Sequence, residues 1–349
     1  MQDNQPKLER DPSRTTSLGK YQSQPIVAVV IPAYRAEHHL AKVLESVPEL
    51  VSQIIVVDDC SPDQTAVIAT QFQEKGRRVH LIQHAVNQGV GGAVLSGYRL
   101  AYQLGAQVVV KMDSDGQMDP AYLPALIAPI LAGEADYTKG NRFLQARALH
   151  SMPLLRRIGN IGLSFLIKLA SGYWRVFDPT NGYTAIHASL IPLLNETAVD
   201  RRYFFESSMF LELGLLGAVV KDVYIPARYT DETSQLSELQ ALFEFPPRLL
   251  QGFMRRLWIQ YFLRDFGLFT IFLVSGLILF IFGAVFGVYH WWVSLRLNTA
   301  ATTGTVMLAV LPIILGVQFL LQAIVLDVQN MPARPLHHER DISLLYQNK

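Results

Sequence analysis

Residues 26–34 have the sequence IVAVVIPAY, a continuous apolar run rich in β-branched side chains. Such a run is typical of a strand that is buried on both faces of a parallel sheet. Three further strands are predicted by similar runs at Gln53–Asp59, Arg78–His84 and Gln107–Gln117, with helical patterns between them. This alternation of strand and helix predicts an α/β fold with an open, mostly parallel sheet and right-handed crossovers.

Helices are expected between and after these strands. Following the second strand, Ser61 is predicted to cap a helix, Pro62 suits its first turn, and Gln64 completes a capping box. The pattern is less regular in residues 120–240. Further helices are expected at residues 38–47, 93–105, 152–172 and 203–217, and a last strand at residues 222–229.

Charge is distributed unevenly along the 349 residues. Between Asp265 and Asp327 there is one charged side chain, Arg296, although the whole chain contains 30 Lys+Arg and 29 Asp+Glu. Within this region, residues 267–288 and 306–328 are each long enough to cross a hydrocarbon core of about 30 Å as helices. A wholly soluble enzyme is therefore not expected, and two spans are too few for a polytopic transporter. The net charge of +1 gives no support to nucleic-acid binding.

A basic amphipathic segment, residues 245–267, precedes the first apolar run, with arginines at positions 248, 255, 256 and 264. Such a helix suits the plane of an anionic membrane surface, although a surface helix that covers the soluble domain would show the same pattern. Arginines also follow the second run, whereas the intervening loop, residues 291–304, contains one. This distribution predicts a multi-pass anchor in the cell membrane with both soluble ends in the cytoplasm.

The polar first 24 residues contain no apolar core of a signal peptide, which favours a cytoplasmic amino-terminal domain. The single cysteine, Cys60, cannot form an intrachain disulfide, as expected in a reducing compartment. The predicted organisation is a polar tail at 1–24, a cytoplasmic α/β domain at 25–240, an amphipathic interfacial helix at 241–265, a transmembrane hairpin at 266–328 with spans at about 267–290 and 305–328, and a cytoplasmic tail at 329–349.

Acidic residues follow the fourth strand. Asp113 and Asp115 are two residues apart at a strand end, so both carboxylates can point into one cleft. Gln117 offers a further oxygen ligand, and hard oxygen ligands suit Mg²⁺ or Mn²⁺, which would bridge diphosphate oxygens. A lone Asp-x-Asp triplet also makes ordinary turns, but a second acidic pair, Asp58-Asp59, ends another strand of the same predicted sheet. The carboxyl ends of these strands are therefore predicted to hold a metal and a ligand.

Two roles are open to Asp58 and Asp59. Either acid can cap the following helix, but Ser61 already suits that role. One carboxylate is therefore predicted to accept a hydrogen bond from the imide N–H of a uracil or from the N1–H and amino group of a guanine.

The glycine-rich segment NQGVGGA, residues 87–93, is not predicted to bind NAD or FAD. In a dinucleotide-binding domain the glycines follow the first strand, whereas these follow the third. They permit either close backbone approach to a ligand or tight packing of strand and helix, and both interpretations stay open.

Four segments, in this order and spacing, resemble glycosyltransferase family 2, which has the Rossmann-like GT-A fold: VVIPAYRAE, VVDDCSPDQT, NQGVGGA with Gly97, and KMDSDGQ. The basic helix and the two apolar runs resemble the polyisoprenyl-phosphate branch, which includes dolichol-phosphate mannose synthases and undecaprenyl-phosphate glucosyltransferases. The resemblance implies an inverting hexosyltransferase that moves a sugar from a nucleotide sugar, such as UDP-glucose or GDP-mannose, to a polyisoprenyl phosphate on the cytoplasmic face. It is compatible with a homo-oligomer.

The resemblance also implies roles for individual residues. Those expected around the nucleotide sugar are Pro32, Tyr34, Glu37, Asp58, Asp59, Gly89, Asp113, Ser114, Asp115 and Arg228. Those expected at the metal are Asp113, Asp115 and Gln117, and the catalytic set is Asp115, Asp178 and Arg142. Those expected at the acceptor phosphate are Arg142, Arg156 and Arg157, each of which is otherwise a solvated surface charge. Those expected in the sugar and acceptor pocket are Asp178, Asn181, Gly182 and Glu206.

The chain departs from the family pattern in three places. Val90 stands where the family often has a lysine, Thr184 where it often has an arginine, and residues 231–235, DETSQ, replace the usual Gly-Glu-Ser-Lys stretch. Two basic residues near the acceptor or diphosphate are therefore missing. The identity of the sugar and the residues that bind the lipid phosphate stay open.

The predicted chemistry is direct displacement at the anomeric carbon by a lipid phosphate oxygen. A phosphate monoester with a second pKa of about 6 is largely ionised near neutrality, so a general base is not obligatory. Asp178 is accordingly predicted to orient the substrates or bind the sugar rather than to act as an essential base.

Two other functions fit parts of the sequence. A processive polysaccharide synthase would need a Gln-x-x-Arg-Trp motif and more spans, and Gln251 to Trp258 contains these letters in the wrong spacing. A membrane scaffold with a decayed site would explain Val90 and Thr184, but the intact acidic motif argues against it.

Overall fold

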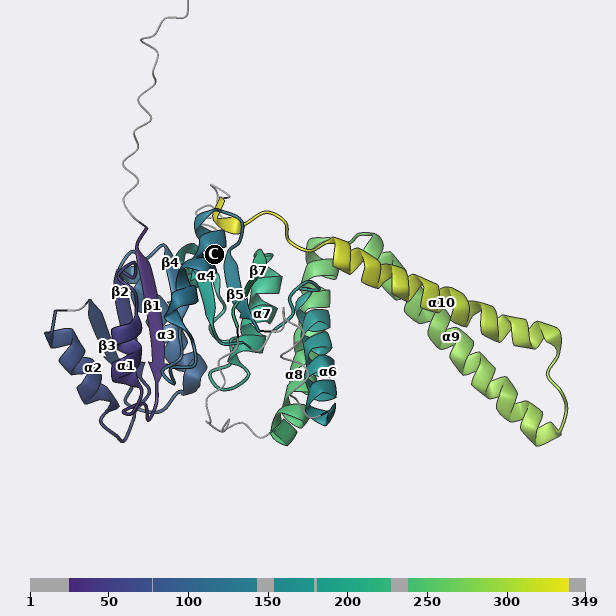
Figure 1. The fold of residues 1–349 in the computed structure, drawn as a ribbon. Coiled ribbons are helices and arrows are strands. Elements are labelled where there is room, and N and C mark those ends of the chain that lie inside the picture. Colours follow the sequence, from purple (N-terminus) through teal and green to yellow (C-terminus); the bar gives the residue numbers. More distant parts are fainter. Residues whose placement is uncertain (1–24, 77, 143–153, 179–180, 227–237, 339–349) are drawn as a thin grey trace, which may run out of the picture.

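The computed structural model describes residues 25–76, 78–142, 154–178, 181–226 and 238–338, without the side chains of residues 154–158, 160 and 238–243. Seven strands within these ranges form one sheet in the order β3-β2-β1-β4-β6-β5-β7 (Figure 1). Their bounds are β1 Val27–Ala33, β2 Gln53–Asp58, β3 Val79–Gln83, β4 Val108–Lys111, β5 Tyr137–Asn141, β6 Thr184–His187 and β7 Val220–Tyr224.

The sheet is mostly parallel, as the apolar strand runs predict. β1 pairs in parallel with β2 and β4, β2 with β3, and β5 with β7, whereas β6 is antiparallel to both β4 and β5. Reversal of β6 brings its first residues to the same edge of the sheet as the last residues of its two neighbours.

Helices cover both faces of the sheet. Those of the α/β part are α1 Leu40–Ser46, α2 Thr65–Glu74, α3 Gly89–Gln103, α4 Leu123–Leu131, α6 Leu154–Ser171 and α7 Phe205–Leu216, with short 3-10 turns η1 Pro120–Tyr122 and η2 Ala188–Leu193. Alternate residues of β1 enter different cores: Val29 packs with α1, α2 and α4, and Val30 packs with α3 and α7. This three-layer arrangement confirms the predicted α/β fold class.

Two strands were not predicted, and the predicted cap of α2 was wrong. β5 and β6 were not expected, because short segments with buried polar residues such as Lys139 lack the apolar signature of β1. Likewise, α2 begins at Thr65 and is not capped by Ser61. Ser61 Oγ instead accepts a hydrogen bond from Arg35 N at 3.1 Å, and Asp63 Oδ1 accepts one from Thr65 N at 3.2 Å. The carboxylate of Asp63, two residues closer to the helix than Ser61, accepts the N–H of the first helical residue.

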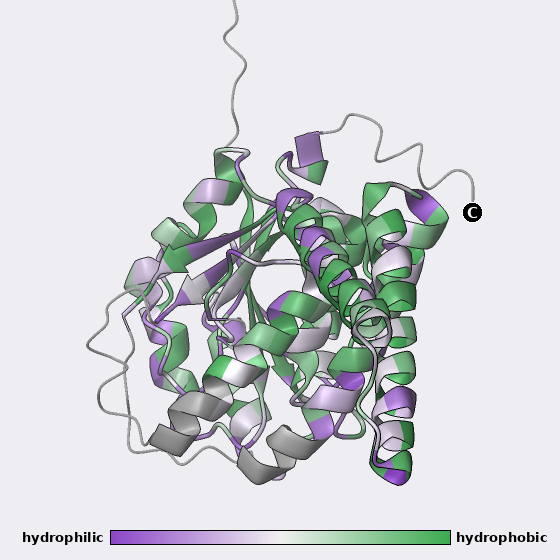
Figure 2. Ribbon diagram, turned by 90° about the vertical axis from the view of Figure 1, so that its right-hand side faces the viewer, coloured by the Kyte–Doolittle hydropathy of each residue, from purple (hydrophilic) through white to green (hydrophobic). Residues whose placement is uncertain are grey.

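The carboxyl-terminal part begins with α8 Glu238–Leu257, which continues as a π-helix, η3 Trp258–Arg264. Two long helices follow, α9 Leu268–Leu297 and α10 Thr303–Gln329, and both have the length and hydropathy to cross a membrane. They form a hairpin that projects from the α/β domain (Figure 1). Seen from the side of the hairpin, the long helices carry mostly hydrophobic residues (Figure 2). The connection is shorter than predicted because α9 continues to Leu297, so the expected loop at 291–304 is reduced to residues 298–302.

The arginines of α8 and η3 face the α/β domain and not only the solvent. Arg248 pairs with Asp200, and Arg255 pairs with Glu212. Arg256 pairs with Asp327 at the end of α10. These contacts place the arginines of the amphipathic helix against acids of the domain and of α10.

After α10 the chain returns to the α/β domain. A short turn, η4 Leu336–His338, packs beside the amino-terminal end of β5, where Asp136 accepts hydrogen bonds from Leu336 N and His337 N at 2.9 and 3.2 Å. The ring of His337 stacks on that of His187, with centroids 4.3 Å apart. This contact lies at the edge of the sheet opposite the carboxyl ends of β1, β2 and β4.

Candidate active site

The carboxyl ends of four parallel strands lie side by side at one edge of the sheet. The register pairs Ala33 with Asp58 and Asp58 with Gln83, and the last residue of β4, Lys111, pairs with the first residue of β6, Thr184. The loops that meet at this edge are residues 34–39, 59–64, 84–88, 112–119 and 181–183. Open α/β sheets bind their ligands at such an edge.

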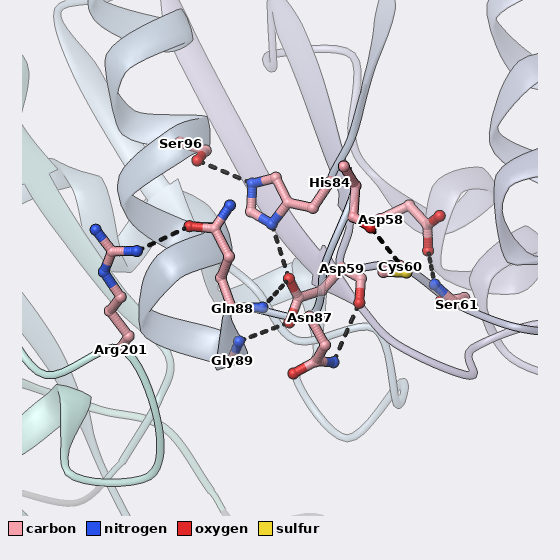
Figure 3. A network of polar contacts seen from close by, with 11 residues as sticks. Asp58, Asp59, Cys60, Ser61, His84, Asn87, Gln88, Gly89, Ser96 and Arg201 are labelled. Carbon is pink, nitrogen blue, oxygen red and sulfur yellow. Dashed lines mark hydrogen bonds and ion pairs between the residues drawn. The ribbon is translucent and has the colours of Figure 1, made fainter.

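Asp59 is the centre of a polar network between β2, β3 and α3 (Figure 3). Its Oδ1 lies 2.7 Å from His84 Nδ1 and accepts a hydrogen bond from Gln88 N at 2.8 Å. Its Oδ2 accepts one from Gly89 N at 2.7 Å. On its other side the imidazole of His84 reaches Ser96 Oγ, at 3.0 Å from Nε2. The carboxylate thus satisfies two N–H groups at the start of α3, where the helix dipole favours a negative charge.

Asp58 is buried beside this network but makes fewer internal contacts. Among the described residues its carboxylate accepts one hydrogen bond, from Ser61 N at 3.2 Å, whereas that of Asp59 has three partners. The geometry therefore favours Asp58 over Asp59 as the acid that meets a ligand.

The glycines of residues 87–93 lie in the first turns of α3 and not in a preceding loop. Gly91 N donates to Arg201 O at 2.8 Å, and a Cβ at Gly91 would lie 2.2 Å from Asp200 O. A Cβ at Gly89 would lie 2.4 Å from Arg201 O. Of the two interpretations left open by the sequence, approach to a ligand or tight internal packing, these positions favour packing. Gly89 and Gly91 let α3 pack against the backbone of residues 200–202.

The loop after β1 is held against the start of α2. Glu37 Oε2 accepts from Gln64 N at 3.1 Å, and Glu37 N donates to Asp63 Oδ2 at 3.3 Å. Pro32 is buried within β1, whereas the ring of Tyr34 is exposed at the edge. Glu37 thus stabilises the loop that presents Tyr34.

Asp113, Ser114, Asp115 and Gln117 form the loop after β4. Asp115 Oδ1 accepts from Gln117 N at 2.9 Å. A Cβ at Gly182 would lie 2.9 Å from Asp113 Oδ2, so the missing side chain leaves room in front of that carboxylate. Two carboxylates and an amide oxygen are ligands that fit Mg²⁺ or Mn²⁺, which usually take one or two carboxylates plus substrate phosphates. The described residues contain no group of three or more His, Cys, Asp or Glu suited to a metal.

Lys111 connects this loop to α7. Its buried Nζ lies 2.8 Å from Asp113 Oδ1 and 3.2 Å from Glu206 Oε1. A Cβ at Gly182 would approach the same Nζ to 2.6 Å. Burial by itself would lower the pKa of Lys111, but the carboxylates of Asp113 and Glu206 raise it above its ordinary value. The site therefore contains a permanent positive charge beneath the acidic loop.

Arg142 and Asp178, two of the predicted catalytic residues, form a bidentate ion pair. Arg142 Nε and Nη2 lie 2.8 and 3.0 Å from the two oxygens of Asp178, and Arg142 N donates to Asp178 Oδ2. Asp178 is buried, and the guanidinium is partly exposed. Nearby, Asn181 Nδ2 donates to Gly140 O at 2.8 Å and its Oδ1 accepts from Tyr183 N at 3.0 Å. Since both oxygens of Asp178 bind Arg142, this geometry suits an orienting residue better than a base.

A second lysine, Lys139 of β5, is fully buried. Burial lowers its pKa to about 7, although Glu206 and Asp178 act in the opposite direction. Its Nζ lies 4.9 Å from the centroid of the Phe210 ring. Near neutral pH this lysine is therefore only partly protonated, in contrast to Lys111.

Some predicted residues lie outside the described parts. Arg228 and residues 231–235 belong to the segment 227–237, and the side chains of Arg156 and Arg157 in α6 are not described. The remaining predicted residues all lie at the same edge of the sheet or on α7. Lys111, Lys139 and His84 were missed by the sequence analysis. Lys111 had a detectable signal, since a lysine ending an otherwise apolar buried strand needs counter-charges.

Comparison with known proteins adds an independent finding. The profile described as glycosyl transferase family 2 matches residues 28–192. UDP-N-acetylglucosamine--dolichyl-phosphate N-acetylglucosaminyltransferase from Methanococcus voltae is 34% identical over 191 residues, which are 51% of this chain and 76% of that protein. Undecaprenyl-phosphate mannosyltransferase from Micrococcus luteus is 29% identical over 204 residues, 57% of this chain and 82% of that protein.

Among solved structures, similarity is found to glucosyl-3-phosphoglycerate synthase from Mycobacterium tuberculosis, crystallised with Mn²⁺, UDP and glucosyl-3-phosphoglycerate. The TM-score is 0.48 at 22% sequence identity, and the match covers 66% of this chain and 80% of that chain.

Proposed function

Because the chain belongs to glycosyltransferase family 2, we propose that it transfers a hexose from a nucleotide sugar to the phosphate of a polyisoprenyl lipid. One observation carries the proposal: the domain with acidic loops at a strand edge is joined to a hairpin of two long apolar helices. Such a hairpin would hold the domain at a bilayer, where an isoprenoid acceptor resides. The named acceptors of two relatives, dolichyl phosphate and undecaprenyl phosphate, support this acceptor class.

Donor binding is assigned to the edge formed by β1, β2 and β4. We propose that Asp58 accepts a hydrogen bond from the base and that exposed Tyr34 lies against the base or ribose. Asp59 and Gly89 then act by fixing the start of α3. Asp113, Asp115 and Gln117 would hold Mg²⁺ or Mn²⁺, whose chemistry is to neutralise charge on the departing diphosphate.

The acceptor side is assigned to the Arg142–Asp178 pair. Asp178 holds the guanidinium of Arg142 in one orientation through both carboxylate oxygens. A fixed, partly exposed guanidinium is suited to bidentate contact with a phosphate. The lipid phosphate is largely ionised near neutrality and attacks the anomeric carbon as the nucleoside diphosphate leaves, with inversion. No general base is needed for this step.

The hairpin supports a proposed location of the α/β domain on the cytoplasmic side of a membrane. With two spans and a short connection, the α/β domain and the chain after α10 lie on the same side, and the docking of η4 on Asp136 agrees with this. The arginines before α9 favour the cytoplasmic side.

The test is transfer of labelled sugar from nucleotide sugars to polyprenyl phosphate by the purified full chain with Mg²⁺ or Mn²⁺. Asp115→Asn is expected to reduce the rate at least about 100-fold, because it removes a charge that holds the metal. Glu134→Gln is the matched control, since Glu134 pairs with Lys221 at the opposite edge of the sheet. Absence of transfer with every donor would contradict the proposal and favour a scaffold. Repeated addition of sugars would favour a polysaccharide synthase.

A further inference from the structure

Asp222 of β7 joins two segments of the candidate active site. One oxygen of its carboxylate, Oδ2, accepts hydrogen bonds from Asn141 Nδ2 and from Phe177 N, both at 2.8 Å. Arg142 follows Asn141 directly in the chain, and Asp178 follows Phe177. A single carboxylate oxygen thus holds together the residues that precede the two members of the Arg142–Asp178 ion pair.

The parallel pairing of β5 with β7 explains how this side chain reaches Asn141 (Figure 1). The register places Asp222 opposite Lys139, which is two residues before Asn141 in β5. Because side chains alternate between the two faces of a strand, Lys139 and Asn141 point to the same face of the sheet as Asp222. Phe177 N meets the carboxylate on this face.

The backbone before Asp178 is not anchored by the side chain of Phe177. This side chain is 62% exposed, and its ring lies against Lys168, whose Nζ is 4.1 Å from the ring centroid. The hydrogen bond from Phe177 N to Asp222 instead ties the segment to the sheet. The position of Asp178, and with it the position of Arg142, therefore depends on a strand that contains neither residue.

Burial of the Asp222 carboxylate is unfavourable for folding. Burial raises its pKa, although the hydrogen bonds from Phe177 and Asn141 and the charge of Lys139 act in the opposite direction. Its Oδ1 is buried and has no hydrogen-bond partner within the described part of the chain. An unmatched buried oxygen lowers the stability of the folded protein. Asp222 is therefore better explained by what it positions than by a gain in stability.

We propose that Asp222 is a positioning residue for sugar transfer, which directs the guanidinium of Arg142 towards the acceptor phosphate by holding Asn141 and Phe177 in a fixed relation. This inference rests on the function proposed above and adds a residue that acts through the ion pair. Asp178 sets the orientation of the guanidinium, and Asp222 sets where the pair lies on the sheet. A displacement of about 1 Å at a group that positions a substrate can lower a rate about 100-fold.

The experiment measures steady-state transfer by the purified full chain, with undecaprenyl phosphate and the donor found active in the test above varied in turn. Asp222→Ala removes the acceptor of both hydrogen bonds. Asp222→Asn keeps one acceptor oxygen and places its amino group at the position of Oδ1, and Asp222→Glu keeps the charge but lengthens the side chain. Asp136→Ala is the matched control, because Asp136 is also a buried carboxylate that accepts backbone N–H groups but lies at the opposite edge of the sheet.

All variants are assayed below their unfolding midpoints. Asp222→Ala is expected to lower kcat/KM for undecaprenyl phosphate about 10-fold or more, and Asp222→Glu several-fold, while the KM of the nucleotide sugar changes less than about twofold. Asp222→Asn is expected to retain most of the activity, and Asp136→Ala is expected to leave kcat/KM for the acceptor unchanged. In an Arg142→Lys background, where the bidentate pair is already lost, Asp222→Ala is expected to add less than about a twofold loss.

The possible failures of this inference and of the proposed function are distinguishable. Transfer by Asp222→Ala and Asp222→Glu with the same kcat/KM for the acceptor as the unmodified chain would overturn the positioning role and leave the proposed function intact. An undiminished loss in the Arg142→Lys background would show that Asp222 does not act through Arg142. Absence of transfer by the unmodified chain would overturn the proposed function, and this inference with it.

Discussion

At the scale of single residues, the buried ammonium of Lys111 holds three separate segments together. It bonds Asp113 in the acidic loop and Glu206 on α7, and it lies against Gly182 before β6. Because Lys111 is 1% exposed, water does not replace these contacts when one is lost. Lys111 is therefore a positioning residue for the proposed metal and sugar sites.

Lys111→Met is expected to destabilise the protein by about 1–3 kcal/mol, since Asp113 and Glu206 lose their counter-charge but are partly exposed to water. The matched control is Lys221→Met, which removes the exposed Lys221–Glu134 pair and is expected to cost about 0–1 kcal/mol. The measurement is the thermal unfolding midpoint of the full chain in detergent. Equal midpoints for the two variants would contradict the role of Lys111.

At the scale of elements, the close contact between the start of α3 and residues 200–202 positions the Asp59 network. The first turn of α3 supplies the N–H groups of Gln88 and Gly89 to Asp59, and Gly91 bonds the Arg201 carbonyl. No side chain fits between the two backbones at this point.

Gly91→Ala is expected to destabilise the protein by about 2–4 kcal/mol, because its Cβ would lie 2.2 Å from Asp200 O and overpacking forces the backbone apart. Gly159→Ala is the control, since among the described residues no atom outside its own helix turn lies within 4 Å of its added Cβ, and alanine favours the helix by up to about 1 kcal/mol. Thermal midpoints again provide the comparison. A Gly91→Ala protein as stable as Gly159→Ala would show that α3 can shift freely.

The contact of η4 with the sheet is expected to depend on pH. Burial lowers the pKa of His187 to about 4, and the neighbouring rings of His337 and His338 act in the same direction, whereas Asp136 opposes them. Between pH 6.5 and 4 the unfolded chain binds a proton at this residue and the folded protein does not, so stability falls as the pH falls through this window.

His187→Phe is expected to reduce the loss of folding stability between pH 6.5 and 4. Phenylalanine retains a ring against His337 but has no titrating group. The measurement is the slope of the thermal midpoint against pH from 7 to 4, with His38→Phe, an exposed histidine, as the control. Identical slopes for His187→Phe and the unmodified chain would refute the assignment.

At the scale of the whole molecule, the hairpin is joined to the domain by a buried ionic cluster. Asp327 Oδ1 and Oδ2 lie 2.8 and 3.0 Å from the guanidinium of Arg256, and Asp327 also bonds Tyr261 and Trp174. A cavity of about 230 Å³ lies beside this cluster, against Gly172. The cluster connects α10, η3 and α8, and it holds the hairpin in one orientation against the domain.

Arg256→Met alone is expected to destabilise the protein by about 3–5 kcal/mol because it leaves Asp327 buried without its partner. The double variant Arg256→Met/Asp327→Leu is expected to recover most of that loss, since two apolar residues replace the pair. Thermal midpoints of both variants and of Asp327→Leu complete the double-mutant cycle. A double variant less stable than either single variant would contradict the coupling.

Much of the fold was predictable because its elements have local signatures. β1 to β4, the helices between them and the two apolar helices follow from patterns of apolar residues in their own segments. β5 was missed because its buried Lys139 and Asn141 hide the apolar signature of a strand, and β6 was missed because it is only four residues long. The predicted site residues that the structure describes gather at one edge because β1, β2 and β4 are parallel neighbours.

The sequence by itself determined the α/β fold class, the two long apolar helices and the acidic motif, because periodicity and strand-end position are properties of contiguous residues. Only the tertiary structure decided which charges meet. It assigned Asp59 to the start of α3, Asp178 to Arg142, Lys111 to Asp113 and Glu206, and the arginines of α8 to acids of the domain. Partners in an ion pair are selected by distance in space, which the order of residues along the chain does not specify.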